Sequence, residues 1–187
     1  MKRSKSKMRN NRRSQAHLRY KKQRQRNVLA SAGAHDFVLI LDHLKAGFNV
    51  AKIFRSAQAF GAKAVHLLDI GEFDPAPAKG AFKYVPAKFY TDFAESYAAL
   101  NAENYTFYCL EPDAPSILSD ISLAKNAAFI FGNEEFGIDF DLSLYPDIQR
   151  VSIPQFGNVQ SLNVSVAASI CMYEYIRQNS SSNNHKK

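Results

Sequence analysis

Short apolar runs alternate with a helix-like pattern in the first half of the body of the chain. Phe37–Leu41, Ala64–Leu68 and Ala127–Phe131 are uninterrupted apolar runs, which is typical of strands buried on both faces. Between the first two runs, apolar residues recur at helical spacing over Val50–Phe60, and Gly61 stands where a helix C′ residue is expected. A strand, a helix and a strand within roughly thirty residues predict parallel strands joined by a right-handed crossover.

The remaining pattern completes an α/β domain. Asp92–Leu100 reads as a helix, Tyr105–Leu110 as a strand and Asp141–Tyr145 as one helical turn, whereas 71–80 and 113–120 look irregular. We therefore predict one α/β domain over residues 28–178, with about five or six parallel strands flanked by helices. In such sheets ligands collect at the carboxyl ends of the strands.

The segment Val151–Arg177 compresses a strand end, a polar loop and a helix start. The strand stops at Pro154, and Ser161 stands where a helix N-cap is expected. An apolar stripe at helical spacing follows, made of Leu162, Val166, Ile170 and Tyr173. Exposed backbone N–H groups at such a place suit a ligand, although an ordinary strand–helix connection has the same pattern.

Charge is distributed unevenly along the chain. Residues 1–27 hold 12 of the 24 Lys and Arg residues and no Asp or Glu, so the rest has 12 basic and 17 acidic side chains. We expect a flexible basic arm over 1–27 that binds the phosphates of a nucleic acid. A solvated tail without a partner and a mitochondrial presequence are the alternatives. The expected phosphate-binding side chains are Arg9, Arg12, Arg13, Arg19, Lys21, Lys22, Arg24 and Arg26. The polar segment 179–187 is expected to be disordered.

Composition excludes several classes of protein. No apolar run approaches the ~20 residues that cross a bilayer, and the N-terminus lacks the apolar core of a secretory signal. Two cysteines in apolar contexts, Cys109 and Cys171, fit a reduced cytoplasmic protein. The five His are scattered, so we expect no metal. Neither a Gly-x-Gly-x-x-Gly turn after the first strand nor a Gly-Lys-Ser phosphate loop is present.

Three segments together resemble the SpoU (TrmH) family of RNA 2′-O-ribose methyltransferases. The first is Asn49–Gly61, which includes Arg55; the second is Gly132–Ile138; the third combines Ile153-Pro154 with Ser161-Leu162-Asn163. They occur in the family's order, and the resemblance covers nearly all of 36–177. It implies the SPOUT fold, a parallel sheet whose carboxyl-terminal strand and helix form a trefoil knot. It also implies a homodimer that binds S-adenosylmethionine near the subunit boundary.

The resemblance also assigns residues to roles. Backbone groups at Gly132, Ile153 and Leu162 are expected to bind the adenine of S-adenosylmethionine, with Asn133 and Gly137 in the same cofactor site. Arg55 matches the arginine that the family uses to handle the ribose hydroxyl. A guanidinium is a poor base, since its pKa exceeds ~12, so we expect it to bind the adjacent phosphate and to lower the pKa of the hydroxyl. The groups expected to orient Arg55 and the ribose are Asn49, Glu134, Ser161 and Asn163.

Each role has a structural alternative. Asn49 can cap a helix, Arg55 can form a surface salt bridge, and Glu134 can be a turn residue. Two departures from the family pattern bear on the loops: Ala46-Gly47 replaces Asp-Pro, and Gln155 replaces the usual Met. The predicted function is methylation of a ribose 2′-hydroxyl in tRNA or rRNA. The alternatives are a non-catalytic RNA-binding or ribosome-assembly protein that keeps the fold, and a SPOUT enzyme that methylates a base nitrogen.

Overall fold

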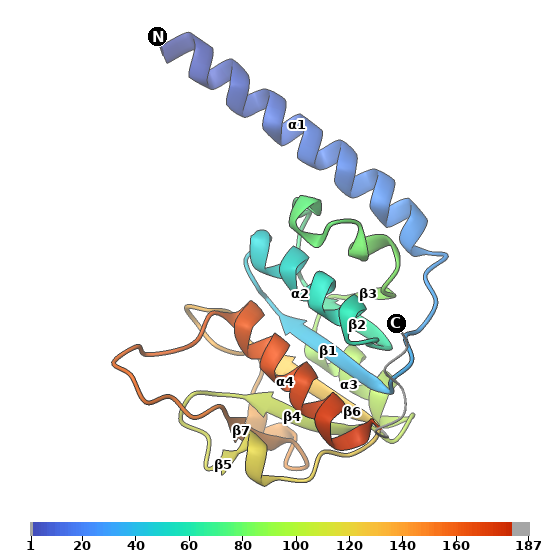
Figure 1. The fold of residues 1–187 in the computed structure, drawn as a ribbon, viewed down its shortest axis with the longest axis vertical. Helices are drawn as coiled ribbons and strands as arrows, with labels where there is room; N and C mark the ends of the chain where they lie inside the picture. Colours follow the sequence, from blue (N-terminus) through green and yellow to red (C-terminus); the bar gives the residue numbers. More distant parts are fainter. Residues whose placement is uncertain (1, 181–187) are drawn as a thin grey trace.

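A seven-stranded sheet forms the centre of the computed structural model, which describes residues 2–180, with side chains from residue 12 onward. All strand pairs are parallel, and the order is β3-β2-β1-β6-β4-β7-β5 (Figure 1). The strands are β1 (Phe37–Asp42), β2 (Ala64–Leu68), β3 (Ala87–Tyr90), β4 (Thr106–Leu110), β5 (Ser116–Ile117), β6 (Ala127–Phe131) and β7 (Gln149–Ser152). The predicted α/β class with a parallel sheet flanked by helices is confirmed.

Helices cover both faces of the sheet, which explains the uninterrupted apolar runs. The helices are α1 (Lys2–Asn27), α2 (Phe48–Ala59), α3 (Phe93–Asn101) and α4 (Val164–Asn179), and the 3₁₀ turns are Ala76–Ala78, Ala81–Lys83, Leu118–Asp120 and Leu142–Leu144. In β1, Leu39 and Leu41 belong to the core shared with α2 and α4, whereas Val38 and Ile40 belong to the core beneath α3. Every residue of β1 is buried, so alternation of polar and apolar residues is absent from this strand.

Two strands were missed because their sequences carry a weak signal. β3 at one edge has only partly buried or exposed residues and includes Lys88. β5 at the other edge has two residues and falls within the stretch 113–120 that was expected to be irregular. Edge strands bury less surface, so they lack the continuous apolar run that marks a central strand.

The amino-terminal arm differs from the expectation of a flexible segment, because residues 2–27 form the helix α1. Residues 2–27 contain no Gly or Pro, so the segment has no strong helix breaker. Tyr20 is buried and packs against the rings of Phe73 and Phe82, at centroid distances of 5.3 and 5.7 Å. Asn27 also joins the body, since its amide donates to the carbonyls of Phe82 and Val85 and accepts from the Ala87 N–H. The second half of α1 is thus part of the folded body (Figure 1).

The start of α4 also differs from the expectation. Asn163, and not Ser161, is its N-cap, and its side-chain oxygen accepts from the Ser165 N–H at 3.0 Å. Both residue types cap helices well, so the pattern alone did not decide between them. Residues 153–163 therefore form a loop that extends away from the sheet (Figure 1). Whether the chain is threaded through these loops as a trefoil knot stays a prediction. The residues 181–187, which were expected to be disordered, lie outside the described residues.

Candidate functional site

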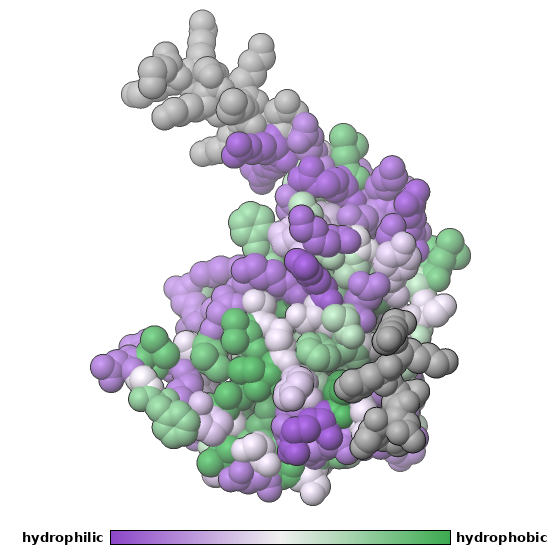
Figure 2. Space-filling view, viewed as in Figure 1, coloured by the Kyte–Doolittle hydropathy of each residue, from purple (hydrophilic) through white to green (hydrophobic). Residues whose placement is uncertain are grey.

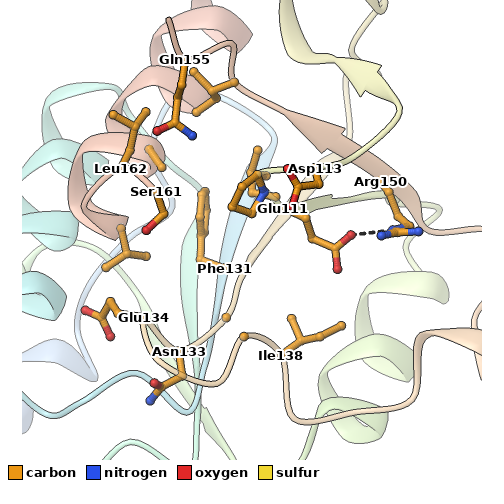
Figure 3. Close-up of a pocket in the computed structure, with 17 residues that line it drawn as sticks. Glu111, Asp113, Phe131, Asn133, Glu134, Ile138, Arg150, Gln155, Ser161 and Leu162 are labelled. Carbon is orange, nitrogen blue, oxygen red and sulfur yellow. Dashed lines mark hydrogen bonds and ion pairs between the residues drawn. The ribbon is translucent and has the colours of Figure 1, made fainter. Parts of the chain in front are cut away.

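A cavity of about 450 Å³ lies where β4, β6 and β7 end and α4 begins (Figure 3). All five residues expected to bind the cofactor line it, and so do two of those expected to act in catalysis. These lining residues are Gly132, Asn133, Gly137, Ile153 and Leu162, with Glu134 and Ser161. The second and third sequence motifs, which are separated by the strand β7, thus meet around one cavity. The roles of the individual residues stay predictions.

The loop after β6 owes its shape to two glycines and an asparagine. Asn133 and Gly137 form a β-bridge through their backbone groups. Gly137 has a φ of +75°, which favours glycine. At Gly132 a Cβ atom would overlap the backbone of Gly137 and Ile138, so only glycine allows this close approach. The Asn133 side chain then holds the loop to the end of β1, because its amide donates to the His43 carbonyl at 2.7 Å.

A hydrogen-bonded chain of three side chains joins the three motifs. Asn49 donates from Nδ2 to Glu134 Oε1 at 2.6 Å. Asn163 donates from its Nδ2 to Asn49 Oδ1 at 3.2 Å. Asn49 does not cap its helix, since α2 has Gly47 at the N-cap position. The Asn49 amide therefore links the three motifs by hydrogen bonds and does not take the capping role that the sequence allowed.

Arg55 lies outside this cavity within one copy of the chain. It follows Asn49 by six residues on α2, or about 9 Å along the helix axis. Its exposed side chain lines a second cavity of about 810 Å³, together with Lys52, Lys79 and Tyr173. Within the described part of the chain, Arg55 has no ion-pair partner, so the alternative of a surface salt bridge finds no support there.

Several lining residues were not predicted from the sequence. Glu111 and Arg150 form an ion pair at 2.5 Å on one side of the cavity, next to Asp113 (Figure 3). The hydrogen bond to Glu111 and its negative charge raise the pKa of Arg150. Gln155 lines another side of the same cavity. The position of Glu111 directly after β4 is the signal that could have identified it, because ligands collect at such strand ends.

A cluster of charged side chains supports the cavity from the end of β1. His43 Nδ1 lies 2.6 Å from Asp42 Oδ1, and its Nε2 lies 3.4 Å from Asp139 Oδ2 and 3.8 Å from Asp69 Oδ2. Burial lowers the pKa of His43, but the hydrogen bond to Asp42 and the three nearby carboxylates outweigh it and raise the pKa. The second oxygen of Asp42 accepts from the Asp139 N–H at 2.6 Å. Asp42 and His43 thereby hold both ends of the loop that carries the second motif.

The apolar stripe predicted on α4 faces outward. Val166 and Tyr173 are 46% and 59% exposed, and Ile170 is only partly buried. Figure 2 shows hydrophobic side chains gathered over the amino-terminal half of α4. The opposite face of α4 packs into the core through residues such as Met172 and Tyr175. The helix therefore has apolar residues on two faces, and only one is covered within a single copy of the chain.

The cationic side chains on α1 fall into two groups. Arg19 forms an ion pair with Asp74, and Arg24 stacks on the Phe89 ring at 3.7 Å from its centroid. The others that are described are exposed. They are Arg12, Arg13, Lys21, Lys22 and Arg26. The side chain of Arg9 lies outside the described residues.

No helix within the described residues is both long and apolar enough to cross a membrane. In the same part of the chain, no group of three or more His, Cys, Asp or Glu residues is arranged to hold a metal ion. The expectation that the protein needs no metal stays a prediction.

A parallel sheet with a cavity built from its strand-end loops defines the class of the chain as an α/β domain with a ligand site at the carboxyl ends of its strands. The model of the SpoU rRNA Methylase family matches residues 36–173. The chain therefore belongs to this family, as its three motifs indicated.

Named relatives give this membership more detail. The chain is 32% identical over 148 residues to the 23S rRNA (guanosine-2′-O-)-methyltransferase RlmB of Nitrosomonas europaea, covering 76% of this chain and 56% of that protein. It is 29% identical over 149 residues to the tRNA (guanosine(18)-2′-O)-methyltransferase of Thermus thermophilus, covering 76% of this chain and 75% of that protein. The chain thus spans little more than half the length of the RlmB relative.

A solved structure supports the fold. The SpoU methyltransferase AviRb from Streptomyces viridochromogenes, in complex with the cofactor AdoMet, superposes with a TM-score of 0.70 at 24% identity. The alignment covers 77% of this chain and 58% of that one.

Proposed function

We propose that this chain is an RNA methyltransferase that uses S-adenosylmethionine to methylate a ribose 2′-hydroxyl in tRNA or rRNA. One observation carries the proposal: the side chains of Asn163, Asn49 and Glu134 bond in series beside the cavity. A non-catalytic binding module has no need for a polar network that links three distant motifs at a ligand cavity. The names of the RlmB and tRNA methyltransferase relatives point to the same reaction.

The residues of the cavity fit an adenosyl ligand. Its volume of about 450 Å³ falls within the range of small-molecule sites. Phe131, Ile138 and Leu162 offer apolar surface for a planar ring, and the loop around Gly132 brings backbone groups to the cavity wall. When bound, S-adenosylmethionine supplies a methyl group that is activated by the neighbouring sulfonium.

The chain's own residues position the acceptor. Arg55 binds the phosphate next to the target ribose, and its positive charge lowers the pKa of the 2′-hydroxyl. The phosphate or a water molecule takes the proton, since a guanidinium stays protonated at all relevant pH values. Asn49, Glu134, Ser161 and Asn163 orient Arg55 and the sugar through hydrogen bonds. Most of the rate enhancement assigned to these groups comes from positioning.

A complete site requires a second copy of the chain. Arg55 faces a different cavity from the one that holds Glu134 and Ser161 within one copy. The uncovered apolar stripe of α4, with the exposed residues Val166 and Tyr173, borders Arg55 in that second cavity. Pairing this face in a homodimer buries the stripe and brings Arg55 of one copy to the cavity of the other. Two-fold pairing of one patch with itself is the commonest form of oligomer.

RNA binding extends from the cavity to α1. The exposed cations Arg12, Arg13, Lys21, Lys22 and Arg26 make this helix a surface for phosphates. Arg19 and Arg24 contribute less, because they already contact Asp74 and Phe89. The two cysteines are buried and unpaired, which fits the reducing compartment of cytoplasmic RNA modification.

Calorimetry and RNA digestion test the proposal together. We expect the protein to bind S-adenosylmethionine and to introduce alkali-resistant linkages into tRNA or rRNA, because a 2′-O-methyl group blocks cleavage there. Arg55→Ala should lose methylation by about 10²-fold or more and keep its cofactor affinity. The control is Arg177→Ala. Arg177 is an exposed arginine in the last turn of α4, where it pairs with Glu174.

The outcomes separate the alternatives. Absence of cofactor binding would favour an RNA-binding protein that only keeps the fold. Methylated nucleosides whose linkages remain alkali-sensitive would favour a base-nitrogen methyltransferase. Equal loss of methylation and cofactor affinity in Arg55→Ala would assign Arg55 a structural role.

A further inference from the structure

Gln155, at the wall of the candidate cofactor cavity, has a side-chain oxygen that lacks a hydrogen-bond donor in the part of the chain that the structure describes. Its side-chain Oε1 is shielded from solvent and accepts no hydrogen bond from any described residue. Figure 3 shows the amide of Gln155 directed into the cavity, opposite Phe131 and beside Leu162 and Ser161. A shielded carbonyl oxygen without a donor destabilises the free protein. A ligand that brings a donor to this atom recovers the loss on binding.

The other polar groups around the cavity are largely engaged. Glu111 and Arg150 pair with each other, Glu134 accepts from Asn49, and Asn133 bonds to the backbone of its own loop and of His43. Among the residues that line this cavity, Gln155 therefore stands out, because its acceptor is shielded and has no donor within the described part of the chain.

The chemistry of a primary amide narrows the choice of ligand group. Its carbonyl acceptor and amino donor lie side by side, which matches an adenine edge that offers an amino donor next to a ring-nitrogen acceptor. The apolar walls formed by Phe131, Ile138 and Leu162 suit the faces of such a ring. The methionine that usually follows Ile-Pro in this family has no acceptor of comparable strength.

We propose that Gln155 is a specificity residue, whose Oε1 accepts a hydrogen bond from the 6-amino group of the adenine of the bound cofactor. The inference rests on the proposed function, because it assumes that an adenosyl ligand enters this cavity. The 6-amino group has two hydrogens, so the backbone near Ile153 can accept one while Gln155 accepts the other. The third motif thus recognises the adenine through the Gln155 side chain as well as through its backbone.

A double-mutant cycle between protein and ligand tests this pairing without any measurement of activity. The two ligands are S-adenosylhomocysteine and its analogue in which hydrogen replaces the 6-amino group. We expect loss of the amino group to weaken binding to the wild-type protein by about tenfold. In Gln155→Met the same ligand change should cost only about threefold, because one of the two acceptors of the amino group is gone and the backbone acceptor remains. Gln160→Met, at an exposed position of the same loop outside the cavity lining, should behave as the wild type.

Thermal unfolding of the ligand-free proteins gives a second readout. Gln155→Met removes the shielded carbonyl, so its melting temperature should rise by about 2 °C relative to the wild type. A fall would mean that the shielded Oε1 does not destabilise the ligand-free protein, and it would overturn the inference. The inference would also be overturned if removal of the 6-amino group weakened ligand binding equally in Gln155→Met and in the wild type. It would be overturned as well if Gln155→Met lost affinity for RNA alone. Failure of the wild-type protein to bind S-adenosylhomocysteine would instead reject the proposed function.

Discussion

Asn49 donates a hydrogen bond from Nδ2 to Glu134 Oε1 at 2.6 Å, across 85 residues of sequence. The same amide accepts from Asn163 at 3.2 Å. The amide of Asn49 suits this position, because it donates on one side and accepts on the other. A network of this kind fixes Glu134 and the start of α4 relative to α2, which also carries Arg55.

Asn49→Asp tests this requirement with almost no change of shape. The new carboxylate faces Glu134 and cannot donate to it, so repulsion replaces the hydrogen bond. We expect methyl transfer to fall by about 10- to 100-fold, with S-adenosylhomocysteine affinity within about twofold of the wild type. Steady-state kinetics and calorimetry measure both. Asn158→Asp, in the exposed part of the 153–163 loop, is the control. Wild-type turnover in Asn49→Asp would mean that the network plays no part in the reaction.

Gly132→Ala should open the loop after β6. The added Cβ would overlap the backbone of Gly137 and Ile138, so the loop has to move away from the cavity. We expect a stability loss of about 1–3 kcal/mol and a loss of cofactor affinity of at least about tenfold. Gly157→Ala is the matched control, since a Cβ there meets nothing within 4 Å. If both variants bind the cofactor equally well, the loop shape at Gly132 is not needed for binding.

His43 should make stability depend on pH. Its folded pKa is raised, despite burial, by the hydrogen bond to Asp42 and by the charges of Asp42, Asp139 and Asp69. The folded protein therefore holds the proton more tightly than the unfolded chain, whose His pKa is about 6.5. The stabilisation is complete below that unfolded pKa and is lost as the pH rises through the higher folded pKa.

Urea unfolding of wild type and His43→Asn across this pH window measures the effect. Asn is chosen because His43 has a φ of +52°, which Asn tolerates better than most residues. The difference in the free energy of unfolding should be largest near pH 5.5 and should shrink above the folded pKa. A difference that is independent of pH would exclude the proposed charge interaction.

The exposed cations of α1 should govern the salt dependence of RNA binding. We expect the Arg12→Gln/Arg13→Gln double variant to flatten the slope of log affinity against log salt by about one to two. Arg19→Gln should change the slope less, because Arg19 is paired with Asp74. Equilibrium titration with tRNA at several salt concentrations measures the slope. An unchanged slope in the double variant would remove α1 from the RNA-binding surface. Point substitutions are preferable to deletion of 1–27, which would also remove the buried Tyr20.

The sequence predicted what depends on local pattern and on strong motifs. The central strands such as Phe37–Asp42 are buried on both faces, so their continuous apolar runs identified them. The motifs around Gly132 and Leu162 came together at one cavity because parallel strands place their carboxyl ends at one edge. The α2 helix was also predicted, since its buried residues, including Ile53 and Phe54, follow helical spacing.

Features that depend on distant contacts could not be predicted in this way. Tyr20 contacts Phe73 and Phe82 only in the folded chain, so the sequence of the basic arm does not indicate that it packs on the rest of the domain. The exposure of the stripe with Val166 on α4 could not be predicted, because periodicity does not distinguish a face that packs in the core from one that packs against another molecule. The separation of Arg55 from the candidate cofactor cavity likewise depends on how α2 packs, and this cannot be predicted from the sequence of α2.

The most direct test mixes two variants that are each inactive. Arg55→Ala keeps the cavity but lacks the guanidinium, whereas Gly132→Val blocks the cavity and keeps Arg55. After joint refolding or co-expression, half of the dimers are mixed, and each mixed dimer holds one complete site. We predict recovery of about a quarter of the wild-type rate of ribose 2′-O-methylation. A mixture no more active than its parts, beside an active wild-type protein, would contradict a site shared between two copies. An inactive wild-type protein would contradict the proposed function itself.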